Sequence, residues 1–341
     1  MKIGVVGTGM FGFALARYLG KKYERDRTVE IMAYDRNKKL IKHLREFRTH
    51  LYHFKNKKLP ENVELTGNKK ELTEGSEIIV MAIPSQAIRE TIREMRGHLE
   101  DGVIILNTAK ALEIGTAKTF SEVISEELEN SLRYTLAKLS GGTFAQDIVN
   151  DAPLGADIAC PDKGVLKKLQ TIFHSKTLRI YPNTDLLGVE YAGAFKNAIA
   201  ILAGIVNGLK LPYGSETHMI SRASKEAKEI AVKLGAKPHT FSMESQCWGN
   251  DLWMSCTGKS RNREFGKLIG IGYSPEEALK KMEEDRKLVE GYYTVNSIPK
   301  LSEETGVKAP ILNEIYKIVY EGKHPRKSIE DIMKMEAEKI K

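Results

Sequence analysis

Hydrophobic and polar positions divide the chain into two differently patterned parts. Up to about residue 181, short β-branched runs alternate with amphipathic helical stretches such as SQAIRETIREMRGHL and AKTFSEVISEELE. The strands expected from these runs read KIGVV, TVEIMAYD, SEIIVMAIP, GVIILNTAK, RYTLAKLSG and GADIAC. Strands and helices that alternate in this way predict an α/β domain over residues 1–181, a doubly wound parallel sheet of the Rossmann type.

From about residue 182 the strand signals stop and long helical patterns begin, which predicts an all-α domain over residues 182–341. Gly208, Gly235 and Gly306 each follow a helical stretch and suit left-handed C-caps. The sequence SPEE at 274–277 has the order of a helix start, with serine as N-cap, proline next and glutamate at the third helical position.

One lysine interrupts an otherwise apolar helical stretch. The segment Tyr191–Val206, YAGAFKNAIAILAGIV, carries a single charged side chain, Lys196. Apolar residues on every face predict a buried helix of about four turns. Burial disfavours an ammonium and lowers its pKa, so Lys196 is a candidate proton acceptor near neutral pH. The alternative is that its aliphatic stem runs along the helix and places the charged end in solvent.

A glycine turn follows the first strand and opens the first helix. Gly7, Gly9 and Gly12 form the pattern GxGxxG, and Asp35 ends the next strand. In this context the pattern predicts a dinucleotide site, with the pyrophosphate at the helix N-terminus. A carboxylate at Asp35 favours the ribose hydroxyls of NAD over the 2′-phosphate of NADP. Arg36 can pair with that phosphate, so NADP stays open as the alternative cofactor.

Ligands of open parallel sheets bind beyond the carboxyl ends of the strands. Those ends are expected to carry Pro84, Lys110 and the run Ser140–Thr143. Lys110 is therefore a candidate for the ligand cleft, and a surface lysine in a loop is the alternative.

Two loops in the helical part are rich in side chains that bind or orient anions. The loop WGNDL contains Asp251, and the loop GKSRNR contains Ser260, Arg261 and Asn262. Arginine offers a planar fork that matches phosphate. Helix capping by Ser260 is the alternative reading, and both readings are compatible because a helix N-terminus itself attracts anions.

Composition and charge exclude several classes of protein. Hydrophobic residues make up 41% of the chain and charged residues 29%, as in soluble globular proteins. The longest apolar run, Ala198–Val206, is too short to span a bilayer, and the chain begins directly with a strand, so a cytoplasmic protein is expected. The net charge of +8 is spread over lysines interleaved with glutamates, which argues against nucleic acid as a partner.

Neither the cysteines nor the histidines form a metal-binding pattern. Cys160, Cys247 and Cys256 include no CxxC pair and no histidine at ligand spacing, so buried or idle thiols and no metal are expected. None of the eight histidines lies in a motif that can be placed at the ligand cleft.

The ordered motifs resemble those of the NAD(P)-dependent glycerol-3-phosphate dehydrogenase family across essentially the whole chain. The motifs are GTGMFGFALA, NTAKALE, LSGGTFAQDI, YAGAFKNAIAILAGIVNGL, ISRASKEAKEIAVKLGAKPHTF, NDLWMSCTGKSRNREFGKLIG with SPEEAL, and VEGYYTV. The resemblance implies a helical domain of the 6-phosphogluconate dehydrogenase-like kind. It also implies an enzyme, commonly a homodimer, that interconverts dihydroxyacetone phosphate and sn-glycerol 3-phosphate with NAD or NADP.

The resemblance also implies roles for individual residues. Lys196 matches the family's catalytic lysine, Lys110 the second substrate-site lysine, and Asp251 a residue that orients Lys196 or a substrate hydroxyl. The implied substrate contacts are Lys110, Gly141, Thr143, Lys196, Asp251, Ser260, Arg261 and Asn262, with Arg261 holding the phosphate. The implied cofactor contacts are Gly7, Gly9, Met10, Phe11, Gly12, Asp35, Arg36, Pro84, Lys110, Ala145, Arg261 and Glu290.

Three departures from the family pattern keep alternatives open. Ala111, Gly142 and Trp248 stand where the family has glycine, proline and small residues, so the substrate could be a different small polyol phosphate. Another alternative is a catalytically silent NAD-binding redox sensor, although a regulator has no need to keep Lys110, Lys196 and Asp251 together. A catalytic cysteine, as in sugar-nucleotide dehydrogenases, would have to be Cys256, which the resemblance already explains.

Overall fold

The computed structural model describes residues 1–129 and 131–334, and its chain groups into two compact units. The first unit consists of Met1–Ala109 and Thr119–Glu190, and the second of Lys110–Lys118 and Tyr191–Lys341. The chain therefore crosses from one unit to the other three times, after Ala109, after Lys118 and after Glu190. A single functional boundary near residue 181 stays a prediction.

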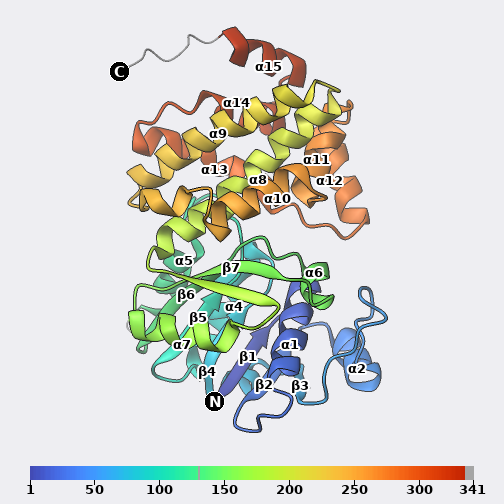
Figure 1. The fold of residues 1–341 in the computed structure, drawn as a ribbon, viewed down its shortest axis with the longest axis vertical. Helices are drawn as coiled ribbons and strands as arrows, with labels where there is room; N and C mark the ends of the chain where they lie inside the picture. Colours follow the sequence, from blue (N-terminus) through green and yellow to red (C-terminus); the bar gives the residue numbers. More distant parts are fainter. Residues whose placement is uncertain (130, 335–341) are drawn as a thin grey trace. The chain divides into compact units, whose positions relative to one another are not determined.

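The first unit is built on an eight-stranded sheet (Figure 1). The strands are β1 Lys2–Val6, β2 Glu30–Tyr34, β3 Val63–Thr66, β4 Ser76–Met81, β5 Val103–Asn107, β6 Tyr134–Ser140, β7 Leu154–Ala159 and β8 Leu178–Asn183. Their spatial order is β3-β2-β1-β4-β5-β6-β7-β8. Strands β1 to β6 pair in parallel, which confirms the predicted doubly wound α/β core.

The sheet differs from the sequence prediction at both edges. Strands β3 and β8 were not predicted, and β7 runs antiparallel to β6. The helix between β6 and β7, α6 (Ala145–Val149), has five residues and is too short to carry the chain back along the sheet as a crossover. Pro182 lies in β8, the last strand of the sheet, where a missing N–H is tolerated.

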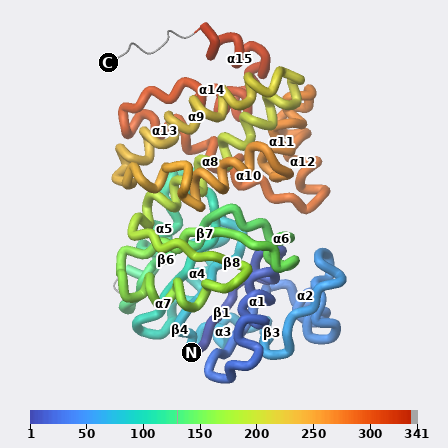
Figure 2. The backbone as a smooth tube through the Cα atoms, viewed as in Figure 1, coloured from blue at the N-terminus to red at the C-terminus, as the bar shows by residue number. Residues whose placement is uncertain are grey.

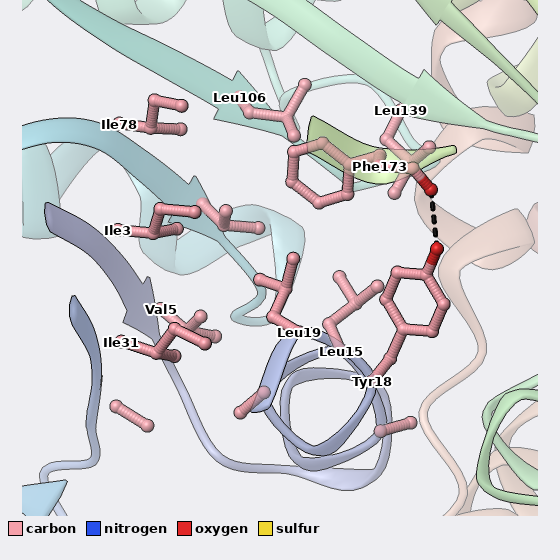
Figure 3. Close-up of a cluster of buried hydrophobic side chains, with 14 of the residues drawn as sticks. Ile3, Val5, Leu15, Tyr18, Leu19, Ile31, Ile78, Leu106, Leu139 and Phe173 are labelled. Atoms are coloured by element: carbon pink, nitrogen blue, oxygen red, sulfur yellow. Dashed lines mark hydrogen bonds between the residues drawn. The ribbon is translucent and has the colours of Figure 1, made fainter. Parts of the chain in front are cut away.

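Helices cover both faces of this sheet. One face packs on α1 (Met10–Lys22) and α7 (Lys163–Phe173) through a buried aliphatic cluster (Figure 3). The Tyr18 hydroxyl donates to the carbonyl oxygen of Phe173 at 2.6 Å and so joins the two helices; the dashed line in Figure 3 marks this bond. Gly4 alternates with Ile3 and Val5 along β1, so it points to the opposite face, where Leu72 of α3 (Lys69–Thr73) lies against it. The remaining helices of this unit are α2 Lys38–Phe47, α4 Ile88–Met95 and α5 Phe120–Leu128.

Most of the second unit is helical. Its central helix is α8 (Leu186–Gly208), whose first residues still belong to the first unit, and α9 (Tyr213–Lys233), α13 and α14 pack against one another beside it (Figures 1 and 2). The others are α10 Asp251–Thr257, α11 Arg261–Gly270, α12 Pro275–Glu284, α13 Glu290–Thr305, α14 Pro310–Tyr320 and α15 Pro325–Lys334. Among the described residues α8 alone is long and apolar enough to cross a membrane, and it is wholly buried.

Helices α8 and α11 meet with their backbones in contact. A Cβ on Gly204 would overlap the carbonyl oxygen of Arg263, and one on Gly266 would overlap that of Ile201. One turn further, Gly208 faces Gly270 in the same way. The prediction that Gly208 is a left-handed C-cap is therefore wrong, because this glycine is needed for close helix packing and does not adopt positive φ.

The other predicted helix ends are confirmed. Gly235 and Gly306 both adopt positive φ, at 105° and 65°. Ser274 caps α12, and its side chain and that of Glu277 form a reciprocal capping box.

Candidate active site

The glycine turn of the first unit combines two crowded positions with one open position. Gly7 has φ of 94°, and a Cβ there would lie 2.7 Å from the carbonyl oxygen of Ala82. A Cβ on Gly12 would overlap the carbonyl oxygen of Gly7 itself. At Gly9 no atom lies within 4 Å of where a Cβ would stand. The packing of the protein therefore requires the first and third glycines, and the second leaves room for a ligand.

The N-terminus of α1 opens at this free space. Gly9 is the N-cap, contributes no capping side chain, and no acidic residue follows in the first turn of the helix. Met10 and Phe11, the first two helical residues, are partly exposed. Unpaired N–H groups and the helix dipole favour an anion at this point. The turn therefore fits the pyrophosphate of a nicotinamide dinucleotide.

Asp35 buttresses the same turn. Its Oδ2 accepts from the backbone N–H and the hydroxyl of Thr8, at 2.8 and 3.0 Å, while Oδ1 accepts from the N–H of Asn37 at 2.9 Å. Each carboxylate oxygen can accept more than one hydrogen bond, so ribose hydroxyls can still bind. Arg36 beside it is exposed.

A buried histidine that sequence reasoning did not place holds the turn from behind. The Nε2 of His50 lies 3.0 Å from the carbonyl oxygen of Thr8, and Nδ1 accepts from the N–H groups of Tyr52 and His53, both at 3.1 Å. These partners select the neutral tautomer with its proton on Nε2. Burial, helped by His53, lowers the pKa of His50 to about 4. No short motif marks a histidine in this role.

In the second unit, one carboxylate joins two lysines. Asp251 is fully buried at the start of α10. Its Oδ2 accepts from the Nζ of Lys110 at 2.6 Å, and its Oδ1 accepts from the Nζ of Lys196 at 3.0 Å. Lys196 is 4% exposed, so the alternative in which its charge reaches solvent is wrong. The structure thus brings together the three residues that were named as catalytic from the sequence.

The two lysines and the aspartate shift one another's acidity. Burial lowers the pKa of Lys196, Lys110 lowers it further, and Asp251 opposes both. Burial acts to raise the pKa of Asp251, but Lys110 and Lys196 outweigh it and hold that pKa below its usual range. The carboxylate therefore stays ionised while Lys196 loses its proton more readily than a solvated lysine. Such a group can accept and return a proton.

Ser255 is a further member of this cluster that was not predicted. Its hydroxyl accepts from the Nζ of Lys196 at 2.8 Å and donates to Asp251 Oδ1 at 3.4 Å. It lies one helical turn after Asp251 on α10, so an i, i+4 reading from the aspartate would have found it. A π-helical turn, Gln246–Asn250, precedes α10 directly and leads into Asp251.

A chain of two amides fixes the surroundings of Lys110. Asn197 Nδ2 donates to the carbonyl oxygen of Lys110 at 2.7 Å, and Asn262 Nδ2 donates to Asn197 Oδ1 at 2.8 Å. Asn262 Oδ1 accepts from the N–H of Gly291 at 2.9 Å. Gly291 follows Glu290, the first residue of α13, so the relay links Lys110 to the helix start that carries this predicted cofactor contact.

Some side chains of the loop at 258–263 make hydrogen bonds within the protein, and others are exposed to solvent. Ser260 caps α11 by accepting from the N–H of Arg263, and its hydroxyl donates to the carbonyl oxygen of Ser255 at 2.7 Å. Arg263 pairs with buried Glu216 at 2.9 Å. Arg261 is exposed at the first residue of α11. Capping by Ser260 is therefore confirmed, and Arg261 is an exposed cation of this loop, as is Lys259.

The remaining predicted residues of the first unit lie after the strands, as expected. Gly141 follows β6 with φ of 157°, and a Cβ there would lie 2.8 Å from the Cα of Ala156. Thr143 is buried and its N–H donates to Gly141 at 2.8 Å. Ala145 begins α6, and Pro84 is exposed after β4.

Trp248 and the cysteines are parts of the hydrophobic core. The indole of Trp248 is 3% exposed and packs edge-on against Phe241, with ring centroids 5.0 Å apart. All three cysteines are free and buried, and burial raises the pKa of Cys256 to about 12. A thiol of this acidity is a poor nucleophile. Among the described residues no group of three or more acidic, histidine or cysteine side chains could hold a metal ion.

The comparisons with known proteins agree along the chain. The family model described as NAD-dependent glycerol-3-phosphate dehydrogenase N-terminus matches residues 2–166, and the one described as the C-terminus matches residues 185–330. The glycerol-3-phosphate dehydrogenase (NAD(P)+) of Clostridium acetobutylicum is 35% identical, with 96% of this chain and 95% of that protein covered. The protein of that name from Syntrophotalea carbinolica is 33% identical, with 98% and 97% covered.

Solved structures with the same fold include two glycerol-3-phosphate dehydrogenases. The enzyme from Coxiella burnetii superposes with a TM-score of 0.89 at 25% identity, covering 98% of this chain and 99% of that one. The enzyme from Saccharomyces cerevisiae superposes with a TM-score of 0.82 at 20% identity, covering 98% and 99%. The fold class predicted from the sequence is thereby confirmed.

Proposed function

Because the chain belongs to the NAD-dependent glycerol-3-phosphate dehydrogenase family, we propose that it interconverts sn-glycerol 3-phosphate and dihydroxyacetone phosphate with NAD or NADP. The observation that carries this proposal is the buried carboxylate of Asp251 between the ammonium groups of Lys110 and Lys196. Two cations around one anion leave a net positive charge, which favours an oxyanion nearby. That is the charge which develops when a ketone is reduced or an alcohol is oxidised.

Lys196 is the proton acceptor and donor of the proposal. In the oxidising direction its free amine takes the proton of the C2 hydroxyl, and in reduction its ammonium returns a proton to the C2 oxygen. The bound nicotinamide supplies the hydride acceptor or donor. The lowered pKa of Lys196 supports this role because the ammonium then gives up its proton more readily than that of a solvated lysine. Asp251 and Ser255 orient its Nζ through their hydrogen bonds.

Lys110 and Arg261 are proposed to bind two different groups of the substrate, the carbonyl oxygen and the phosphate. Lys110 polarises the carbonyl oxygen and stays held by Asp251, at 2.6 Å. Arg261 binds the phosphate with its exposed guanidinium at the start of α11. Ser260 and Asn262 shape this pocket while their side chains keep their internal partners. Gly141 and Thr143 complete the proposed set of substrate contacts on the loop after β6.

The cofactor is proposed to bind at the glycine turn of the first unit. The open space at Gly9 and the uncapped start of α1 support the pyrophosphate position. Asp35 favours NAD moderately, and Arg36 leaves NADP as the second choice. The further contacts proposed for the cofactor are Met10, Phe11, Pro84, Lys110, Ala145, Arg261 and Glu290.

The domain roles follow from these two sites. Residues 1–181 act as the NAD(P)-binding domain and residues 182–341 as the substrate and catalytic domain, with Lys110 reaching the catalytic set from the first stretch of sequence. A homodimer in the cytoplasm completes the proposal, carried over from the resemblance and from the sequence pattern.

Initial rates test the proposal directly. Oxidation of NADH and NADPH is followed with dihydroxyacetone phosphate and with a small panel of other keto-polyol phosphates. Turnover fastest with dihydroxyacetone phosphate is the expected result. Faster turnover of another panel member would identify that compound as the better substrate. Cofactor binding without any turnover would favour the redox-sensor alternative.

A further inference from the structure

A buried carboxylate lies where the chain crosses between its units. Glu190 is 5% exposed and is the last residue of the first unit on α8. Its Oε1 accepts from Asn107 Nδ2 at 3.2 Å and from the N–H of Ser121 at 3.1 Å. Asn107 lies just before the first crossing, and Ser121 just after the second. One carboxylate oxygen therefore ties together the segments of all three crossings.

The same network extends to the residue in front of Lys110. The side chain of Asn107 accepts from the N–H of Ala109 at 2.9 Å, and the buried Nζ of Lys138 donates to the carbonyl oxygen of Ala109. Both polar backbone groups of Ala109 are thus held. Lys110 follows directly, and its own carbonyl oxygen is held by Asn197. The backbone that carries Lys110 is therefore fixed on both sides.

Charge complementarity supports the arrangement. Lys138 is 1% exposed on β6, and its ammonium stabilises the charged form of Glu190. Burial works in the other direction and raises the pKa of Glu190. The Oε2 of Glu190 has no hydrogen-bond partner among the described residues, so this oxygen does not bond to Asn107 or Ser121. Oε1 alone makes both contacts.

We propose that Glu190 is a positioning residue for the two lysines of the reaction. The tie fixes the segment that leads to Lys110, and it fixes the stretch of α8 that carries Lys196 six positions further along the helix. That is about 9 Å of rigid helix. Small errors in the placement of either lysine reduce turnover steeply. This inference rests on the proposed roles of Lys110 and Lys196.

The test compares two replacements of Glu190. Glu190→Gln keeps an oxygen for Asn107 and Ser121, so kcat should stay within about threefold of the parent enzyme. Glu190→Leu fills a similar volume but leaves both donors unpaired, so kcat should fall about tenfold or more. The dissociation constant of NADH, measured by fluorescence quenching, should change less than about twofold because the glycine turn is untouched. Replacing a residue with a purely structural role would not lower kcat while leaving the dissociation constant of NADH unchanged.

Glu226→Leu is the matched control. Glu226 is also buried, and its carboxylate accepts two backbone N–H groups, those of Ile311 at 3.1 Å and Leu312 at 2.9 Å. Its loss should lower the thermal midpoint as Glu190→Leu does, with kcat per folded enzyme unchanged. Unchanged kcat in Glu190→Leu overturns the positioning role. A proportional loss of kcat in Glu226→Leu overturns it too, because any buried carboxylate would then have that effect.

Two further variants keep the inference testable and separate it from the proposed function. If Glu190→Leu does not fold, Asn107→Ala cuts the tie to Ala109 while Glu190 keeps Ser121, and kcat should fall about fivefold or more. A normal kcat in Asn107→Ala then overturns the inference. Lys110→Ala is measured beside it. Full activity of Lys110→Ala would refute the proposed role of Lys110, and a parent enzyme that does not turn over dihydroxyacetone phosphate would refute the proposed function. A Lys110→Ala defect beside a normal Glu190→Leu refutes the positioning role alone.

Discussion

The glycine turn and the lysine–aspartate cluster are built from different kinds of groups. The turn of the first unit is made of backbone and of neutral or buttressing groups, with His50 and Asp35 both bonded to Thr8. The cluster of the second unit is made of side-chain charges, two of them around the buried Asp251. A pyrophosphate needs a shape and a helix dipole, whereas a moving proton needs groups whose pKa values are shifted by their neighbours.

The two regions also differ in how the sequence encodes them. The turn occupies six consecutive positions, in which the packing of the protein requires Gly7 and Gly12 and leaves open space at Gly9. The cluster is assembled from Lys110, Lys196 and Asp251, which come from three separate segments. A local sequence pattern can predict a site such as the glycine turn, whereas the residues of the lysine–aspartate cluster come together only in the folded chain.

The largest expected effect is on kcat, and it comes from replacing Lys196 in the cluster while cofactor binding at the glycine turn is left intact. Lys196→Ala should lower kcat by roughly two or more orders of magnitude, because it removes the group proposed to accept and donate the proton. The NADH dissociation constant should stay unchanged. Lys280→Ala, at an exposed position of α12, is the control. Turnover close to that of the parent enzyme would remove Lys196 from the mechanism.

Arg261→Ala should act on substrate affinity instead. Loss of a charge-assisted bond to phosphate costs about 2 kcal/mol, so the Michaelis constant for dihydroxyacetone phosphate should rise roughly 30-fold. The value of kcat should change much less, because the phosphate is bound in the ground and transition states alike. A fall in kcat alone would show that Arg261 does not bind the phosphate.

His50 should make the stability of the protein depend on pH. Its folded pKa of about 4 lies below the ordinary value of 6.5, so below pH 6.5 the unfolded chain binds a proton that the native state refuses. Its stabilising contribution is present above pH 6.5 and is lost as the pH falls toward 4. Between pH 8 and pH 5 this loss is about 2 kcal/mol.

His50→Gln removes this titration while an amide can still donate to Thr8. Denaturant unfolding at the two pH values should therefore show a smaller pH dependence in the variant. His98→Gln, at an exposed position, should leave the dependence unchanged. Equal slopes in His50→Gln and the parent would mean that folding does not lower the pKa of His50.

The smallest expected effect concerns the choice of cofactor. Asp35→Ser removes the carboxylate that repels a 2′-phosphate, so the preference for NAD over NADP should weaken several-fold. The substitution also removes bonds to Thr8 and Asn37, so binding of both cofactors should fall somewhat. The ratio of kcat/KM for NADH and NADPH is the measurement. An unchanged ratio would assign Asp35 to the support of the turn alone.

Much of the fold was predictable where the pattern is long and regular. Strands β1, β2, β4, β5 and β6 read as β-branched runs, and α8 reads as a buried helix around Lys196. Strand β8 was missed although Leu178 and Ile180 alternate with the exposed Arg179 and Tyr181, because the nearby Pro182 suggested a boundary. The direction of β7 follows from the short helix α6, whose length no local propensity reveals.

The members of the candidate site were predictable to different degrees. Lys196 stands out because a charge in an apolar helix has few explanations. Ser255 and His50 do not stand out, because serine and histidine are common and their roles depend on what tertiary packing places beside them. Trp248 was one of the departures that left the substrate open, and its indole packs on Phe241 within the core.

The glycine contact between α8 and α11 limits how this enzyme can be re-engineered. Lys196 lies on one of these helices and Arg261 begins the other, and any added methyl group at Gly204 or Gly266 meets backbone. Libraries that vary the facing surfaces of the two helices should therefore yield mostly insoluble variants. New substrate ranges are better sought outside this helix contact, at positions where an added side chain does not meet backbone.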